Sequence, residues 1–385
     1  MTIQTSLPDP NLVPSWPPVP EPARIASLGT AVTDHSYSQS DLLDIFGITD
    51  PKIRSVFANS AIERRFLSLP PTGADGTPLP ESQEDLLAKH KRNAVSMGIR
   101  ALRACLADIG AEPADVEHLC CVTSTGFLTP GLSAYIVRDT GMDPRCSRAD
   151  IVGMGCNAGL NALGPTASWA VANPGRLAVL ICSEACSAAY TMDATMRTAV
   201  VNSLFGDGAA AIAVIAGDAE RTRSTQAARD GSYDTSAALR PRILGFSSYI
   251  VTEAIEAMRF DWDSDQNRLS FFLDRDIPYV VGAHAERVVD RLLSDAGLRR
   301  SDVRHWLVHS GGKKVIDAVR VNLGLTRHDL RHTTGVLRDY GNLSSGSFLF
   351  SLQRLHTEGA VRRSDIGVLM TMGPGSTIET ALVQW

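Results

Sequence analysis

The chain has 385 residues, which is enough for a large buried core and for two or three domains or structural halves. Apolar residues make up 44% and charged residues 21% of it, which excludes collagen-like and disordered chains. The formal net charge of −5 gives no general electrostatic reason to bind nucleic acid or an anionic membrane, so we expect neither partner. Any anionic ligand must be held by a local group of basic residues.

The amino-terminal stretch lacks the basic and apolar segments of a signal peptide, and no run of about 18 apolar residues follows it. We therefore expect a cytoplasmic protein without a membrane span. The 7 cysteines are an odd number for a reducing compartment and have no paired CxxC spacing. This usage favours neither disulfides nor a zinc site.

Two stretches divide the chain. Residues 1–23 form a proline-rich arm, which is extended because proline fixes φ and removes backbone donors; it is either an unstructured tail or an arm packed on a partner subunit. Residues 217–242 are rich in Ser, Ala and Arg and are typical of a surface connection. They separate an N-terminal half, residues 24–216, from a C-terminal half, residues 243–385.

The two halves repeat the same order of elements. Apolar strands alternate with helices that open on glycine turns, a pattern typical of a sheet buried on both faces. The first half has strands at residues 118–126, 177–185 and 209–215 and a helix entered at 153–163; the second has strands at 305–312, 366–375 and 377–385 and a helix entered at 339–350. The sequence predicts a duplicated α/β fold, with a large α/β protein without duplication as the alternative.

Cys156 lies in the turn GMGCNAG, at the start of the helix in the first half. The positive end of the helix dipole favours a thiolate there, and the glycines allow a substrate to approach closely. A small buried cysteine is the alternative, and it is our interpretation of the other six. Pro165, two turns into this helix, should kink or end it.

His309 ends an apolar strand, at the carboxyl end where α/β folds bind their ligands. Asn342 occupies the position in the second half that corresponds to Cys156, where its amide either caps a helix or donates to an oxygen that becomes anionic. Together the three residues supply a nucleophile, a base and an amide donor, as acyl transfer through a thioester requires. Papain-like proteases use the same residue types, but the sequence around Cys156 lacks their typical CGSCW surroundings.

Five motifs carry a resemblance to a known family: GCNAG around Cys156, LFGDGAAA (204–211), VHSGGKKVID (308–317), GNLSSGS (341–347) and MGPGSTIE (372–379). Over residues 24–385 the chain resembles the chalcone synthase-like type III polyketide synthases of the thiolase superfamily. The resemblance implies a duplicated five-layer αβαβα fold, a homodimer, and condensation of malonyl-CoA units without a metal or redox cofactor.

Longer segments, such as residues 37–46 and 50–71, resemble a bacterial branch of this family that works in antibiotic biosynthesis. For that branch the resemblance implies enoyl-CoA hydratase-like pathway proteins as partners. Another malonyl-CoA-using type III synthase, such as one that makes tetrahydroxynaphthalene, is the alternative enzyme. A catalytically silent scaffold is the alternative from another class, and the presence of Cys156, His309 and Asn342 disfavours it.

The resemblance also implies roles for single residues. Cys156 would carry the acyl chain and His309 would hold it as a thiolate. His309 and Asn342 would bind the thioester oxygen while malonyl-CoA loses carbon dioxide. Phe205 and Phe271 would form the gate between the CoA tunnel and the cavity.

The implied cavity has further residues. Its lining would comprise Thr125, Cys186, Ala189 and Ser344, with Cys186 and Ala189 departing from the plant pattern. Thr129 would reach the neighbouring subunit's cavity. Gly373, Pro374 and Gly375 would shape the floor through turns that need φ > 0. The implied CoA-binding residues are Lys52, Arg54, Lys313 and Lys314, with Arg64 and Arg65 as a further basic pair; for each, a solvated surface charge is the alternative.

Overall fold

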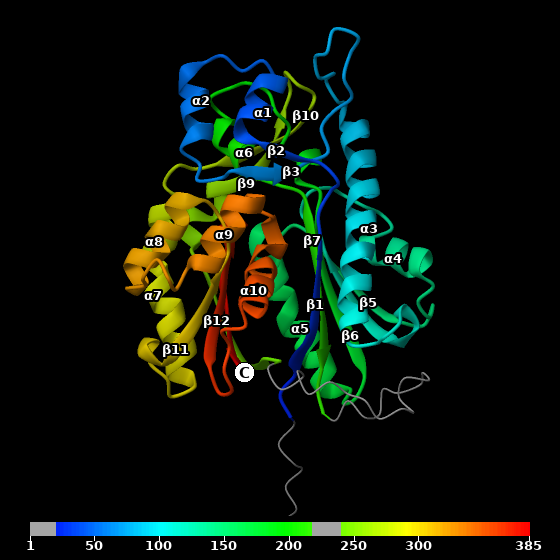
Figure 1. The fold of residues 1–385 in the computed structure, drawn as a ribbon, viewed down its shortest axis with the longest axis vertical. Coiled ribbons are helices and arrows are strands. Elements are labelled where there is room, and N and C mark those ends of the chain that lie inside the picture. The colour runs from blue at the N-terminus through cyan, green and yellow to red at the C-terminus, as the bar shows by residue number, and fades with distance from the viewer. Residues whose placement is uncertain (1–20, 218–239) are drawn as a thin grey trace, which may run out of the picture.

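The computed structural model describes residues 21–217 and 240–385 (Figure 1). Most of the proline-rich arm (1–23) and of the connection (217–242) lies outside the described residues, so the structure tests neither of these two expectations.

The strands are β1 (Arg24–Ala31), β2 (Ser36–Ser38), β3 (Arg64–Phe66), β4 (Val116–Val122), β5 (Ser147–Ile151), β6 (Leu177–Glu184), β7 (Gly208–Ile215), β8 (Arg242–Ile250), β9 (Met258–Asp263), β10 (Arg268–Leu273), β11 (Val303–Val308), β12 (Ile366–Gly373) and β13 (Thr377–Gln384). The helices are α1 (Gln39–Ile45), α2 (Pro51–Ala58), α3 (Gln83–Asp108), α4 (Leu132–Thr140), α5 (Ala158–Ala172), α6 (Ala199–Leu204), α7 (Ile277–Asp295), α8 (Lys313–Leu323), α9 (Arg331–Tyr340) and α10 (Ser347–Glu358). Short 3₁₀ turns η2 (Gly155–Asn157) and η9 (Ser344–Gly346) precede α5 and α10.

The strand order shows the duplication directly. A nine-stranded sheet runs β11-β12-β13-β8-β1-β7-β6-β4-β5. In the first half β4 is parallel to β6, and β6, β7 and β1 follow as antiparallel neighbours. In the second half β11 is parallel to β12, and β12, β13 and β8 follow in the same way. Strand β5 is an additional edge strand, and the two halves meet between β1 and β8 at the pair Arg24↔Arg242.

The helices and strands stack in five layers, as the resemblance implied (Figure 1). Helices α3 and α4 cover the outer face of the first set of strands, and α7 and α8 cover that of the second. Helices α5 and α10 lie between the two sets. Helix α5 contacts β4 and β6 on one side and β12 and β13 on the other, so the central layer joins the halves.

Strands β6, β7 and β12 are buried along their whole length, which explains their near-continuous apolar sequences. The six apolar strands expected from the sequence are all present as β4, β6, β7, β11, β12 and β13. No helix in the described ranges is long and apolar enough to cross a membrane.

Pro165 does not end helix α5, which continues to Ala172, so the expectation of a helix end is wrong. Proline removes one backbone donor, but two hydroxyls nearby bond carbonyls of the same segment. Thr166 donates to the Ala162 carbonyl over 2.8 Å, and Ser168 donates to the Gly164 carbonyl over 3.0 Å. Bonds of this kind, from a hydroxyl to the carbonyl four residues earlier, bend a helix without ending it.

Helix α5 approaches the second half closely at Gly159. A Cβ atom there would lie 2.3 Å from the Ser345 carbonyl oxygen and 2.8 Å from the Cys182 sulfur. Glycine is therefore required by the contact between the turn before α10 and this helix, although a glycine inside a helix costs conformational entropy.

We predict that Gly159→Ala lowers the free energy of unfolding by about 1–3 kcal/mol, because the added methyl group must push the two halves apart. Gly164→Ala in the same helix is the matched control, since its Cβ would meet nothing within 4 Å. The control should keep or raise stability because alanine favours helix. Chemical denaturation of both variants measures the difference, and equal stabilities would contradict the prediction.

Candidate active site

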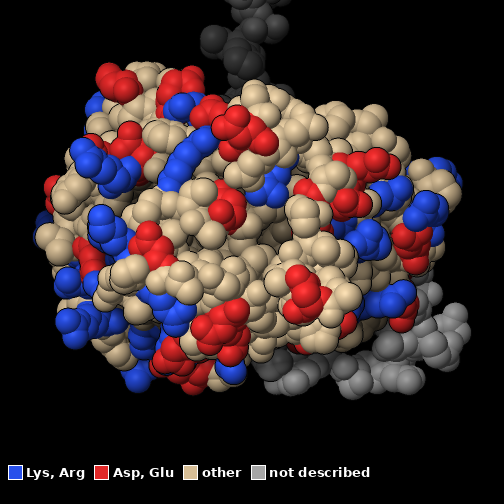
Figure 2. All heavy atoms as spheres, turned by 90° about the horizontal axis from the view of Figure 1, so that it is seen from above, with Lys and Arg blue, Asp and Glu red and all other residues tan. Residues whose placement is uncertain are grey.

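A cavity of about 720 Å³ lies between the two halves, and Cys156, His309 and Asn342 all line it. Its wall also includes residues of α2, α6, β9 and β10, which lie at the upper end of the molecule in Figure 1. Figure 2 shows this end from above, with a hollow near its middle and charges of both signs around it. The structure thus brings together the three residues that the sequence singled out.

Cys156 lies in turn η2, directly before α5. Gly155 beside it has φ 65°, a conformation that favours glycine, and the Pro374 ring occupies the space that a side chain would need. Burial raises the pKa of the Cys156 thiol to about 12, while hydrogen bonds from Ser344 and Asn342 lower it. The helix start favours a thiolate, as expected from the sequence, but desolvation outweighs this effect in the resting site.

His309 follows β11 and is 2% exposed. Its Nδ1 lies 2.9 Å from the Ser347 hydroxyl oxygen, and that hydroxyl also lies 2.7 Å from the Ser344 carbonyl oxygen. A hydroxyl has one hydrogen and the carbonyl can only accept, so Ser347 donates to the carbonyl and accepts from His309 Nδ1–H. This leaves Nε2 with a free lone pair. Burial lowers the pKa of His309 to about 3, so the imidazole rests neutral.

Asn342 has its amide held in one orientation. Its Oδ1 accepts a hydrogen bond from the Ser344 backbone N–H over 2.8 Å, and its Nδ2 lies 4.0 Å from the Cys156 sulfur. The residue therefore caps the following turn and also presents an N–H donor to the nucleophile. Its backbone hydrogen-bonds to Leu204 and Gly206 of the first half, so the loop that carries Asn342 is held against that half.

Sequence reasoning missed a buried carboxylate below the nucleophile. Glu184 ends β6 and accepts hydrogen bonds from Ser345 Oγ (2.5 Å), Ser124 N (2.8 Å), Thr125 Oγ1 (3.1 Å) and Ser344 Oγ (3.3 Å). Burial raises its pKa, which these bonds oppose. An acidic residue at the end of an otherwise apolar strand was the signal that could have revealed it. Thr125 and Ser344 thus belong to this network behind Cys156.

Phe205 and Phe271 both line the cavity, and their rings meet edge to face with centroids 6.2 Å apart. Tyr190, which sequence reasoning missed, packs between them. Its ring stacks on Phe205 at 3.9 Å and meets the edge of Phe271 at 5.3 Å. Phe260 also lines the cavity, stacks on Tyr190 at 6.0 Å and meets the edge of Phe271 at 4.9 Å, so the expected gate is a cluster of four aromatic side chains.

Thr129 was expected at the partner subunit's cavity, and of the other expected residues some line the cavity of this chain and some do not. Thr129 is exposed, Cys186 lines a neighbouring pocket, and Ala189 is not among the residues that line the cavity. Pro374 lines it as expected.

The two glycines beside Pro374 differ in conformation. Gly375 has φ 74°, but Gly373 is extended at φ −166°, so the expected turn with φ > 0 is wrong for Gly373. Glycine is needed at 373 for space instead, because a Cβ would lie 2.2 Å from Asn157 Oδ1.

The basic residues on the cavity wall are only partly those expected. Lys313 and Lys314 line it, together with three arginines that sequence reasoning missed, namely Arg197, Arg259 and Arg275. Lys52 and Arg54 do not line it, and Arg54 donates to the Ile48 carbonyl over 2.9 Å. Because the arginines lie on separate elements, no local sequence motif marked them.

Arg65 is 2% exposed and does not face solvent as a phosphate-binding residue would. Its guanidinium donates to the Phe205 carbonyl over 2.8 Å and to Gln39 Oε1 over 3.0 Å. Burial lowers its pKa to about 9. The side chain therefore supports the aromatic gate from behind, and it is neither the CoA-binding residue nor the solvated surface charge that the sequence offered. Arg64, its neighbour, is exposed.

Among the described residues, no group of three or more His, Cys, Asp or Glu side chains is placed to hold a metal ion. The seven cysteines are all buried and free.

Two family models match most of the chain. The N-terminal domain of chalcone and stilbene synthases matches residues 20–219, and the C-terminal domain of the same family matches residues 257–385. Among solved structures, PKS-I from the brown alga Ectocarpus siliculosus superposes with a TM-score of 0.82 at 24% identity, covering 94% of this chain and 98% of that one. This likeness concerns the fold.

Two relatives of known function differ widely in their similarity to this chain. A 3,5-dihydroxyphenylacetyl-CoA synthase of Amycolatopsis orientalis is 67% identical over 365 residues, covering 95% of this chain and 94% of the relative. A 1,3,6,8-tetrahydroxynaphthalene synthase of Streptomyces peucetius subsp. caesius is 29% identical over 374 residues, covering 94% and 93%. The chain therefore belongs to the chalcone and stilbene synthase family, the type III polyketide synthases.

Proposed function

We propose that the protein is a 3,5-dihydroxyphenylacetyl-CoA synthase that builds a tetraketide from malonyl-CoA on Cys156. The observation that carries the proposal is the convergence of Cys156, His309 and Asn342 in one cavity between the halves. The 67% identity to a relative of that name supports this product over tetrahydroxynaphthalene, whose synthase is 29% identical.

The reaction begins when the Cys156 sulfur attacks the thioester carbonyl of an acyl-CoA. The free lone pair of His309 Nε2 takes the thiol proton, which turns two neutral buried groups into an ion pair whose members stabilise each other. The bond between the acyl carbon and the CoA sulfur breaks, and CoA leaves as a thiolate that takes a proton from solvent. The chain is then held on Cys156, while the thiol proton stays on His309 Nε2.

Malonyl-CoA then binds and loses carbon dioxide. The electron pair of the broken carbon–carbon bond stays on the α-carbon, and the negative charge spreads to the thioester oxygen. The Nε2–H of protonated His309 and the Nδ2–H of Asn342 donate to that oxygen. Both donors are held in place beforehand, His309 by Ser347 and Asn342 by the Ser344 backbone, so little reorganisation is needed as the charge forms.

The carbanion attacks the acyl carbon on Cys156. A carbon–carbon bond forms, the carbon–sulfur bond breaks, and Cys156 leaves as a thiolate, which the lengthened chain on CoA can acylate again with release of CoA. After the tetraketide stage, an internal carbon–carbon condensation closes the ring, and loss of one water together with enolisation of the two remaining ketones gives the dihydroxyphenyl product. None of these steps is an oxidation or a reduction, so the proposed reaction needs no redox cofactor.

The assembly around this site is also part of the proposal. We infer a cytoplasmic homodimer in which Thr129 borders the partner's cavity, which its exposure and the 72% exposure of neighbouring Phe127 support. Enoyl-CoA hydratase-like proteins of an antibiotic pathway would assist the dehydration and aromatisation.

Pure protein given malonyl-CoA alone should form polyketide products detectable by mass spectrometry, with a mass that separates the dihydroxyphenylacetyl from the tetrahydroxynaphthalene skeleton. Cys156→Ala should abolish chain extension, because no acyl chain can be held, whereas a silent scaffold would make nothing in either form. Absence of every malonyl-derived polyketide from the folded wild-type protein would sink the proposal.

Ser347→Ala should shift the pH profile of Cys156 alkylation by iodoacetamide to higher pH, because the protonated imidazole loses the acceptor for its Nδ1–H. A hydrogen bond to a charged group contributes about 1.5–3 kcal/mol, or about one to two pH units. Ser351→Ala in the same helix is the control, since within the described residues its hydroxyl donates to the Ser347 carbonyl and does not contact His309. Identical profiles for both variants would contradict the role of Ser347.

Replacing both Lys313 and Lys314 by Ala should raise KM for malonyl-CoA with little change in kcat, because exposed cations bind the CoA phosphates before and after the chemistry. The expected increase is about two- to fivefold per charge, and it should shrink at high salt. The double variant Lys52→Ala/Arg54→Ala should leave KM unchanged. A larger effect of the second pair would contradict this prediction and would place the CoA phosphates at Lys52 and Arg54 instead.

A further inference from the structure

A second pocket of about 430 Å³ lies behind the aromatic gate. Tyr190 and Phe205 line both this pocket and the catalytic cavity of about 720 Å³, so their side chains form the wall between the two. Both volumes lie in the range of about 300–1,000 Å³ that is typical of small-molecule sites. The second pocket is large enough to hold several two-carbon units of a chain.

Of the two wall residues, Tyr190 can be substituted with less disturbance of the catalytic loop than Phe205. The backbone of Phe205 pairs with Asn342 and is held by Arg65, so changes there would disturb the catalytic loop. Tyr190 instead follows a short turn and is joined to it through its backbone N–H, which donates to the Cys186 carbonyl over 2.9 Å. Its ring stacks on Phe205 and separates the second pocket from the catalytic cavity, and its backbone is not paired with Asn342.

The Tyr190 hydroxyl has no hydrogen-bond partner within the described ranges of the chain. Burial raises its pKa well above 10, and the nearby Cys156 and Glu184 raise it further, so it stays a neutral phenol beside the nucleophile. Tyr190 is only partly buried, and its hydroxyl is not among the fully buried polar atoms that lack a partner, so the side chain borders the open space of the two pockets that it lines.

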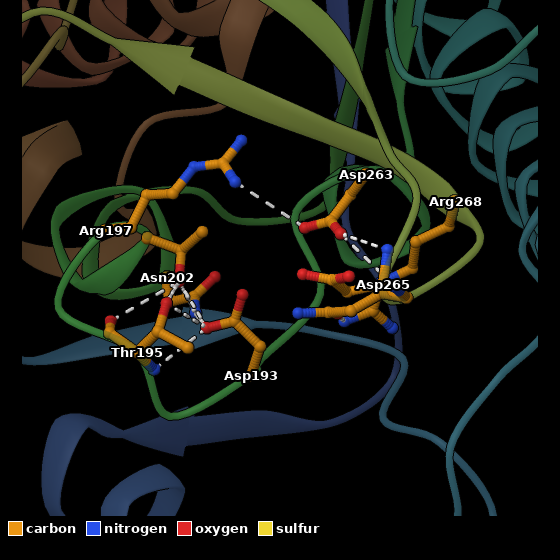
Figure 3. Close-up of polar contacts among 9 residues, drawn as sticks. Asp193, Thr195, Arg197, Asn202, Asp263, Asp265 and Arg268 are labelled. Atoms are coloured by element: carbon orange, nitrogen blue, oxygen red, sulfur yellow. Dashed lines mark hydrogen bonds and ion pairs between the residues drawn. The ribbon is translucent and has the colours of Figure 1, made fainter.

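The second pocket is chemically suited to an oxygen-rich chain. Arg65 and Asn202 line it, and within the described residues Arg65 Nε and Asn202 Oδ1 are buried without a hydrogen-bond partner. Arg268 lines the same pocket, and burial lowers its pKa. Figure 3 shows Arg268 across from Asp193, which is held by Thr195 and Asn202. These donors and acceptors fit keto and hydroxyl oxygens.

We propose that Tyr190 is the partition that limits the length of the polyketide chain, by closing the catalytic cavity against the second pocket. The inference rests on the proposed function. A chain fixed to Cys156 and confined to the cavity must fold back on itself once it fills the space, and ring closure then competes with further extension. Without the tyrosine ring, the chain end could enter the second pocket and extend further before it cyclises.

The test compares Tyr190→Ala and Tyr190→Phe with the wild type, using malonyl-CoA alone and mass spectrometry of both released products and chains on Cys156. Tyr190→Ala should raise the fraction of chains longer than the tetraketide at least about fivefold, whereas Tyr190→Phe, which keeps the ring, should retain the wild-type lengths. In the Tyr190→Ala background, Leu79→Trp should restore shorter chains, because Leu79 lines the second pocket from its exposed side.

Unchanged chain lengths in Tyr190→Ala, or longer chains in Tyr190→Phe as well, would overturn the inference. If Tyr190→Ala does not fold, Tyr190→Leu removes the ring while keeping apolar bulk, and it should give the same direction of change. Failure of the proposed function can be told apart from failure of this inference, because the wild type itself would then make no polyketide from malonyl-CoA.

Discussion

The contact between helix α5 and the turn before α10 is the constraint on which the site depends. Gly159 allows the Ser345 carbonyl to lie against α5, and this contact brings Cys156 from one half to Asn342 from the other. His309 is added from the end of β11 and is held by Ser347 on α10. Neither half contains the complete set of reacting groups, so the activity depends on the seam between the duplicated halves remaining intact.

Burial then decides the resting state of the site. Desolvation raises the pKa of Cys156 and lowers that of His309, so the nucleophile and the base start neutral. Charge arises when the thiol proton moves to Nε2, and again when malonyl-CoA loses carbon dioxide. At each stage the groups that meet this charge are already held by hydrogen bonds, which is how a dry cavity can favour an anionic intermediate.

Sequence patterns predicted the strands, the duplication and the three central residues, because long apolar runs and glycine turns are local signals. They did not predict partners that depend on tertiary contact. Ser347 follows Asn342 by five residues, yet only the packed helix shows that it accepts from His309. The sequence offered Arg65 as a CoA-binding or a surface cation, although it is buried behind Phe205, and Gly373 needs space rather than an unusual φ. Tyr190 had no motif, since its position as a wall exists only between two cavities.

The most direct test of the account is to identify the atom that carries the growing chain. The protein is mixed with isotopically labelled malonyl-CoA, quenched within one turnover, digested and mapped by mass spectrometry. The account predicts labelled acyl groups on the peptide that contains Cys156, absent from the Cys156→Ala variant. Label on another cysteine, or product formation without any labelled Cys156, would contradict it.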